Sequence, residues 1–239
     1  MASTGIAGDD NGSVPKRNVP NSSASAGSVP ADGKKKTVSS SPERRSELLG
    51  VAAEVFAELG YNATTVRKIA DAAGMLAGSL YYHFDSKESM LDEILSTFLD
   101  ELWAGYDAVL AADLGPRETI EALVVESFRE IDRHRAAVAI YQKESRYLSA
   151  QPRFTYLAES QQKFEKAWLG TLERGVAAQV FRADLDVRLT YRFVRDTVWV
   201  AASWYRPGGL HSPDEIARQY LSMVLDGIAL RSGHPWQQP

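Results

Sequence analysis

The sequence of 239 residues contains no cysteine and only four histidines. Without thiols the chain can form neither a disulfide framework nor a thiolate metal site, and the histidines are too scattered to show metal-ligand spacing. No apolar run approaches the length that spans a membrane, and the N-terminus lacks the apolar stretch of a signal peptide. We therefore expect a cytoplasmic protein with no membrane partner, no cofactor and no metal.

A strong charge of one sign is also missing, since the formal net charge is −4. This excludes a nucleic-acid binder that is basic throughout, so any contact with DNA must come from a local patch. The basic side chains that could form such a patch are Arg44, Arg45, Arg67, Lys68 and Lys87.

Large apolar side chains are nearly absent from residues 1–40, where Ser, Gly, Ala, Pro and Asn dominate. Such a segment cannot offset the entropy cost of folding, so we expect a disordered tail there and a frayed tail at 232–239. Between them the periodicity is helical and no strand pattern competes, which predicts an all-α protein. One helix is predicted to start at Pro42 and a long one after Ser86, with further helical patterns near 116–133, 136–149, 152–178, 186–206 and 213–231.

The segment from Thr64 to Lys87, TTVRKIADAAGMLAGSLYYHFDSK, has the pattern of two short helices joined by a glycine turn. Gly74 allows the chain to reverse, and a second helix is predicted from Ala77 to Phe84. Within it Leu80 and Phe84 lie four residues apart and face inward. The side chains left on the outward face are Gly78, Ser79, Tyr81, Tyr82 and His83. Because this face has no bulky charge, the edge of a DNA base can approach it closely.

This segment resembles the helix-turn-helix of the TetR/AcrR family of regulators, with its paired threonines, IAD-type run, glycine turn, LYYHF-type close and SKE continuation. A departure lies at Leu76 and Ala77, where family members often have Ser followed by Lys, Arg or Pro, so the usual helix cap is missing. The resemblance implies a three-helix DNA-binding head, at 41–87, and a helical ligand-binding and dimerisation domain, at 88–231.

We therefore predict a homodimeric repressor that binds double-stranded operator DNA and is released by a small molecule. Thr65 and Lys87 are expected to contact phosphate, Arg67 a base or a phosphate, and the short second helix the major groove. The predicted DNA-binding residues are Thr65, Arg67, Lys68, Ala77, Gly78, Ser79, Tyr81, Tyr82, His83 and Lys87.

The segment from Asp186 to Arg206 projects as a helix with two separate apolar faces. One face contains Val187, Tyr191, Val194, Val198, Ala202 and Tyr205, and the other contains Leu189, Phe193, Val200 and Trp204. A lone domain needs only one such face, so the second is expected to meet another subunit, and the resemblance likewise implies dimerisation through the last two helices. The predicted interface residues are Val200, Trp204, Tyr220, Val224 and Leu225.

Arg195 and Trp199 lie one helical turn apart, on a strip between those two faces. A guanidinium and an indole suit a pocket for an anionic or carbonyl-bearing ligand with a flat body, and the alternatives are a structural ion pair or a solvated basic strip. Tyr141, Gln142 and Trp168 are candidates for further walls, although aromatic residues at helical spacing are more often core.

Three runs later in the chain, IYQKESRYLSAQPRF, FRADLD and YRFVRDTVWV, resemble TetR-type repressors of cholesterol catabolism, in particular those of the late stage that degrades rings C and D. This resemblance implies a coenzyme A thioester of a bicyclic steroid remnant as the inducer. The alternatives are a fatty-acyl-CoA or multidrug sensor of the same family, and a purely architectural DNA binder without a ligand.

Catalytic patterns are sparse, so we predict that the protein is not an enzyme, with an all-helical enzyme as a distant alternative. Glu130 and His134 lie four residues apart, but no second pair of this kind accompanies them to hold a metal. His134 lies between Arg133 and Arg135, which is typical of an exposed corner. No serine has the context of a nucleophile elbow.

Overall fold

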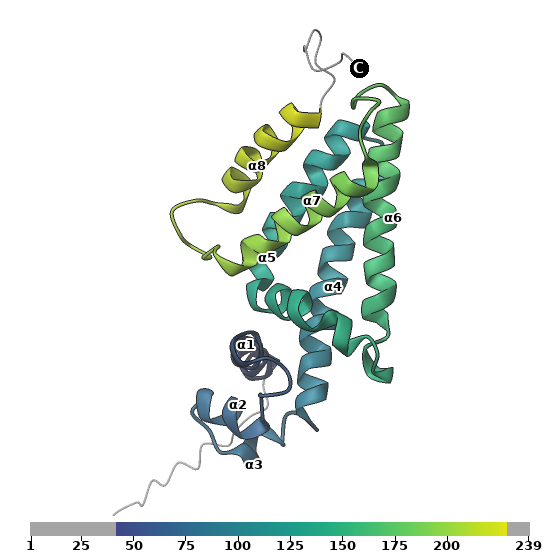
Figure 1. Ribbon diagram of the computed structural model, residues 1–239. Helices are drawn as coiled ribbons and strands as arrows, with labels where there is room; N and C mark the ends of the chain where they lie inside the picture. The colour runs from purple at the N-terminus through teal and green to yellow at the C-terminus, as the bar shows by residue number, and fades with distance from the viewer. Residues whose placement is uncertain (1–41, 229–239) are drawn as a thin grey trace, which may run out of the picture. The chain divides into compact units, whose positions relative to one another are not determined.

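The computed structural model describes residues 42–228, with side chains described as far as Leu225. Every regular element in this range is a helix, which confirms the predicted all-α class (Figure 1). The tails predicted at 1–40 and 232–239 lie outside the described residues. No helix between Pro42 and Ile228 is long and apolar enough to cross a membrane.

The head contains helices α1 (Pro42–Leu59), α2 (Val66–Ala72) and α3 (Ala77–Leu80). Helix α3 ends four residues before the predicted limit at Phe84. The reason is local, because the N–H groups of Tyr82 and His83 donate to carbonyls three residues back, which tightens the chain into a turn.

Helix α4 (Lys87–Ala111) leaves the head and continues into the body of the molecule (Figure 1). Its start is fixed by a capping box, in which Ser86 accepts from the N–H of Ser89 and the Ser89 hydroxyl lies 3.2 Å from the N–H of Ser86. The apolar side of α4 is buried from Met90 to Tyr106, so a single stiff element joins the head to the body.

Helix α5 (Pro116–Leu148) is the central element of the body and packs against α1, α4, α6, α7 and α8. The sequence predicted two helices here, near 116–133 and 136–149, and the structure joins them across a break at His134, whose φ is −127° and ψ 35°. Figure 1 shows the two parts of α5 running in different directions.

The remaining elements are a short 3₁₀ turn η1 (Pro152–Phe154), α6 (Tyr156–Ala177), α7 (Val187–Trp199), a second turn η2 (Val200–Ser203) and α8 (Pro213–Ile228). Helix α7 therefore ends earlier than the predicted limit at 206, because the chain tightens to 3₁₀ geometry at Val200. Asp186 caps α7, and Ser212 pairs with Glu215 at the start of α8.

Candidate functional site

The predicted DNA-contacting face is presented by α3 and the turn after it. Leu80 and Phe84 are buried and anchor this segment to the head, as the spacing predicted. Tyr81 and Tyr82 are 56% and 74% exposed, and Gly78 and Ser79 are also exposed. His83 is half-buried, with its ring edge-on to Tyr82. The segment thus holds small and aromatic side chains outward on a rigid support.

The start of α3 confirms the missing cap, because no side chain bonds to its first N–H groups and Leu76 at this position is 80% exposed. Periodicity did not single out Leu76 as a surface residue. An exposed leucine beside the predicted reading face is suited to an apolar contact, such as one with a thymine methyl group.

The basic residues of the head differ in how many contacts their charged groups make within the chain. Arg67 is 86% exposed. Lys68 donates to the Ala63 carbonyl, and Lys87 donates to the carbonyls of Tyr61 and Thr64 while its ammonium lies 4.2 Å from the Tyr61 ring centre. Lys87 therefore holds the chain that leads into α2, a structural role that the sequence did not reveal, and one of its three N–H donors is left for a phosphate.

Thr65 caps α2, because its hydroxyl oxygen accepts from the N–H of Lys68 at 3.3 Å. The side chain is exposed, so the hydroxyl hydrogen is available to a phosphate oxygen. Capping and a phosphate contact are compatible at this position.

A cavity of about 560 Å³ lies between α4, α5, α6 and α7. All five residues predicted to bind a ligand line it, although they come from three different helices. The lining residues are Phe98, Leu102, Tyr141, Gln142, Ser145, Arg146, Gln161, Phe164, Trp168, Tyr191, Arg195, Asp196 and Trp199. Ser145 and Arg146 were not among the predicted residues, although they follow Tyr141 and Gln142 by one turn and so share their face.

Six of the thirteen residues that line this cavity are aromatic. Trp199 lies edge-on to Phe98 and Phe164, with ring centres 6.3 Å and 6.2 Å away. Trp168 is buried, and Tyr141 lies edge-on to Phe98. These residues pack as core residues do and also bound the cavity, so both interpretations of the aromatic pattern apply to the same side chains.

The polar groups of the cavity lie on α5, α6 and α7. The Nε of Arg195 donates to Asp196 at 2.7 Å, and the guanidinium carbon lies 5.5 Å from the Tyr191 ring centre. The hydrogen bond to Asp196 raises the pKa of Arg195, so the side chain stays charged. Burial raises the pKa of Tyr141 to about 12, which leaves its phenol protonated and able to donate at neutral pH. Gln142, Arg146 and Gln161 are exposed at the rim.

The two apolar faces predicted for α7 are both present. Tyr191, Val194, Val198, Ala202 and Tyr205 are buried, whereas Leu189, Phe193, Val200 and Trp204 are 45%, 62%, 48% and 56% exposed. Helix α8 adds Met223, which is 69% exposed. These five exposed residues, hereafter the apolar surface, are large side chains without a cover in this subunit.

On α8 the prediction was wrong for Leu225, which is buried at 1% exposure inside its own subunit. Tyr220 is also engaged within the subunit, because its hydroxyl lies 2.8 Å from that of Thr197 and its ring is edge-on to Phe128. The helical period correctly indicated an apolar helix here, but the predicted interface included residues of the face that packs into the core. Val224 is half-buried.

Comparison with known proteins matches two family descriptions to different parts of the chain. Residues 48–94 match the family described as bacterial regulatory proteins, tetR family, and residues 113–228 match the tetracyclin repressor-like C-terminal domain. The chain is 58% identical over 186 residues to the HTH-type transcriptional repressor KstR2 of Rhodococcus jostii, covering 78% of this chain and 91% of that protein.

Solved structures agree with this fold. The ketosteroid transcriptional regulator KstR2 of Mycobacterium tuberculosis has a TM-score of 0.76 and 48% identity, covering 80% of this chain and 97% of that one. AibR in complex with isovaleryl coenzyme A and operator DNA shares the fold at a TM-score of 0.63 and 20% identity, covering 75% of this chain and 97% of that one. The chain belongs to the TetR family of bacterial transcriptional regulators.

Proposed function

We propose that this protein is a transcriptional repressor that binds operator DNA as a homodimer and is released when an acyl-coenzyme A fills the cavity between α4 and α7. The observation that carries the proposal is the position of α4. Its first residue, Lys87, holds the chain before α2, and further along the same helix Phe98 and Leu102 line the cavity. One helix thus contacts the DNA-binding head and also lines the cavity.

Release follows from this arrangement as a two-state linkage. A ligand that fits the cavity only when α4 is displaced must favour the displaced state, and the same displacement moves the head. In a dimer, a tilt of both heads changes the distance between the two reading faces, which must match the separation of the operator half-sites.

The size of the cavity indicates which part of the ligand it holds. A volume of about 560 Å³ suits a drug-sized body rather than a whole coenzyme A thioester. The acyl part would therefore lie among the aromatic rings. The coenzyme part would extend out of the cavity past Gln142, Arg146 and Gln161 at the rim. Arg195 is positioned for the thioester carbonyl or a ring ketone.

Flat aromatic walls favour a rigid ring system over a long flexible chain, because a rigid ligand loses less conformational entropy on binding. The relative from M. tuberculosis is described as a ketosteroid regulator, in keeping with such a body. We therefore propose the coenzyme A thioester of a bicyclic steroid remnant, a hexahydroindanone propionate, as the inducer.

A binding experiment separates this proposal from its alternatives. An operator duplex is first selected from random DNA with the purified protein, and its release is then followed by fluorescence anisotropy. The hexahydroindanone propionate thioester is expected to release the duplex at micromolar concentration, whereas free coenzyme A and the unesterified acid are not. Release by palmitoyl-CoA alone would identify a fatty-acyl sensor, and no release by any thioester would contradict the inducer assignment.

A further inference from the structure

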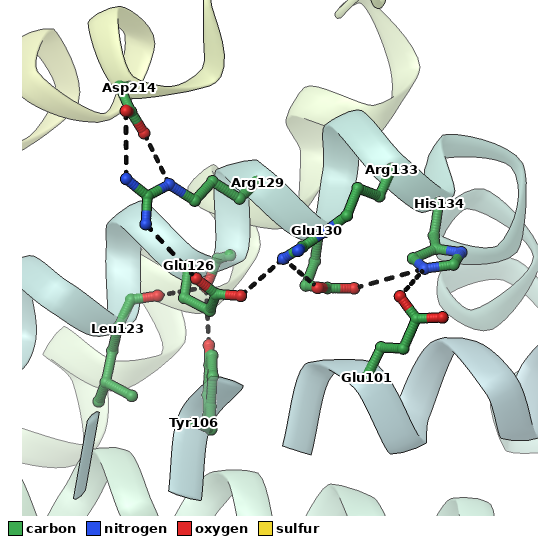
Figure 2. A network of polar contacts seen from close by, with 10 residues as sticks. Glu101, Tyr106, Leu123, Glu126, Arg129, Glu130, Arg133, His134 and Asp214 are labelled. Carbon is green, nitrogen blue, oxygen red and sulfur yellow. Dashed lines mark hydrogen bonds and ion pairs between the residues drawn. The ribbon is translucent and has the colours of Figure 1, made fainter. Parts of the chain in front are cut away.

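A polar network joins the middle of α4 to α5 and α8 (Figure 2). Its carboxylates are Glu101, Glu126, Glu130 and Asp214, and its guanidinium groups are Arg129 and Arg133. Carboxyl groups therefore outnumber guanidinium groups in this network by four to two. A further cation is therefore favoured at this place.

Glu130 is the buried member, with a side chain that is 0% exposed. Neither of its carboxylate oxygens has a hydrogen-bond partner among the described residues. Oε1 lies 2.5 Å from Nη2 of Arg133, whereas Oε2 points toward the ring of His134, with 3.9 Å between it and Nε2 (Figure 2). A buried carboxylate oxygen normally has a hydrogen-bond donor or a cation beside it. Oε2 of Glu130 has no such hydrogen-bond donor among the described residues, and it can therefore accept a cation.

His134 was expected at an exposed corner, and this was wrong, because its side chain is only 21% exposed. The break in α5 at this residue is accompanied by an approach to α4, where Nε2 lies 2.9 Å from Oε2 of Glu101. The sequence offered only the pair Glu130 and His134. The fold adds Glu101, so one atom from each of these three residues lies within 4.8 Å of the others.

The cluster can be reached from outside. His134 lines a second cavity of about 390 Å³, which lies between α1, α4 and the part of α5 from Asp132 to Ala137. Glu101 is 49% exposed and can change rotamer without disturbing the core.

We propose that Glu101, Glu130 and His134 bind one divalent metal ion of the zinc type. One imidazole nitrogen and two carboxylate oxygens match zinc, which accepts mixed N and O ligands at about 2.0–2.2 Å, with water in the fourth position. Magnesium is disfavoured because it prefers oxygen ligands in an octahedron. Nε2 of His134 lies 2.9 Å from Oε2 of Glu101 and 3.9 Å from Oε2 of Glu130. Two ligand atoms of one tetrahedral zinc ion lie roughly 3.4 Å apart, so small side-chain rotations suffice to bring these atoms to that separation.

Such an ion would tie α4 to the break in α5. Because the ligand atoms come together only in the folded chain, binding should stabilise the native state.

The test uses the full chain without an affinity tag, after treatment with a chelator and removal of the chelator. Isothermal titration with zinc chloride is expected to give one ion per chain, and native mass spectrometry should show the same mass increment. Zinc should also raise the melting temperature, and magnesium should not. The variants Glu101→Gln and His134→Gln should each weaken zinc binding by about tenfold or more.

The matched control is His211→Gln, which removes an exposed histidine outside the cluster and should bind zinc as the unmodified chain does. Cobalt provides a second readout, since its visible absorption reports coordination by nitrogen and oxygen without requiring a change in stability. Absence of a stoichiometric site, or equal zinc affinity in the Glu101→Gln variant and the unmodified chain, would overturn the proposal. Zinc lost only from the His211→Gln variant would do so as well.

Discussion

The indole of Trp199 on α7 lies edge-on to the ring of Phe98 on α4, with the two ring centres 6.3 Å apart and an interplanar angle of 83°. Both residues line the ligand cavity. A ligand that separates these two rings therefore acts directly on the helix that leads to the DNA-binding head.

Replacing Arg195 with Met should raise the inducer concentration needed for release, because the methionine keeps an apolar stem and removes the donors. A lost charge-assisted hydrogen bond is worth roughly 1.5–3 kcal/mol, or about tenfold or more in concentration. Operator binding without inducer should be unchanged. The control is Arg192→Met, one turn away on α7 and outside the cavity lining, and equal release curves for the two variants would refute the assignment.

Replacing Trp199 with Leu should also weaken the inducer response, because the flat wall against Phe98 and Phe164 is lost. The same change removes core packing, so a lower melting temperature is expected too. Comparing the inducer titration at a temperature where both proteins are fully folded separates these effects. A variant that is destabilised but retains the original inducer response would show that Trp199 has a purely structural role.

Lys87 and Tyr82 are expected to affect DNA binding in different ways. Tyr82→Ala removes an exposed ring from the reading face and should reduce discrimination between operator and scrambled duplexes. Lys87→Ala should weaken binding to both duplexes alike and lower the salt dependence. Titrations on both duplexes at two salt concentrations make the comparison, and unchanged affinities in both variants would show that the DNA-contacting surface is elsewhere.

Lys87→Ala should also reduce the free energy of unfolding by about 1–2 kcal/mol, because two carbonyls and the face of Tyr61 lose their cation. Lys166→Ala, an exposed lysine on α6, is the control and should change stability by less than about 0.5 kcal/mol. Urea unfolding of the three proteins measures both values.

Trp204→Glu should convert the dimer to a monomer, because it replaces a large exposed ring of the apolar surface with a charge. Leu114→Glu is the control, since Leu114 is a similarly exposed apolar residue, at 43%, and lies in the connection between α4 and α5 rather than on α7, η2 or α8. Sedimentation velocity at micromolar concentration distinguishes the species. A monomeric unmodified protein, or a dimeric Trp204→Glu variant, would contradict the proposed interface.

Stability should fall in acid in part through Asp214 on α8. Hydrogen bonds from Arg129 lower the pKa of Asp214, so its ionised form is favoured in the folded chain. A carboxyl with a lowered pKa stabilises the fold above its unfolded pKa, which is about 3.9, and loses this contribution as the pH falls through the folded pKa. Asp214→Asn should flatten the dependence of melting temperature on pH below about 5, and an unchanged pH dependence in this variant would contradict the assignment.

The sequence alone determined the helices and most of their faces. Leu80 and Phe84 were expected inside and are buried, and the two apolar faces of α7 were expected and are present. These features depend on the helical repeat, which is a local property and can be counted along the chain. Helix capping is equally local, because Asp186 and Ser212 accept from the N–H groups of the residues three positions ahead, at the starts of α7 and α8.

The tertiary structure decided which of those faces meet, because packing between helices depends on contacts far apart in sequence. It placed Leu225 in the core, brought Arg195, Tyr141 and Trp168 around one cavity, and engaged Lys87 with two carbonyls. It also brought Glu101 of α4 beside Glu130 and His134. No spacing rule anticipates that cluster, since its members lie on two helices whose relative position is set by the packing of the whole core.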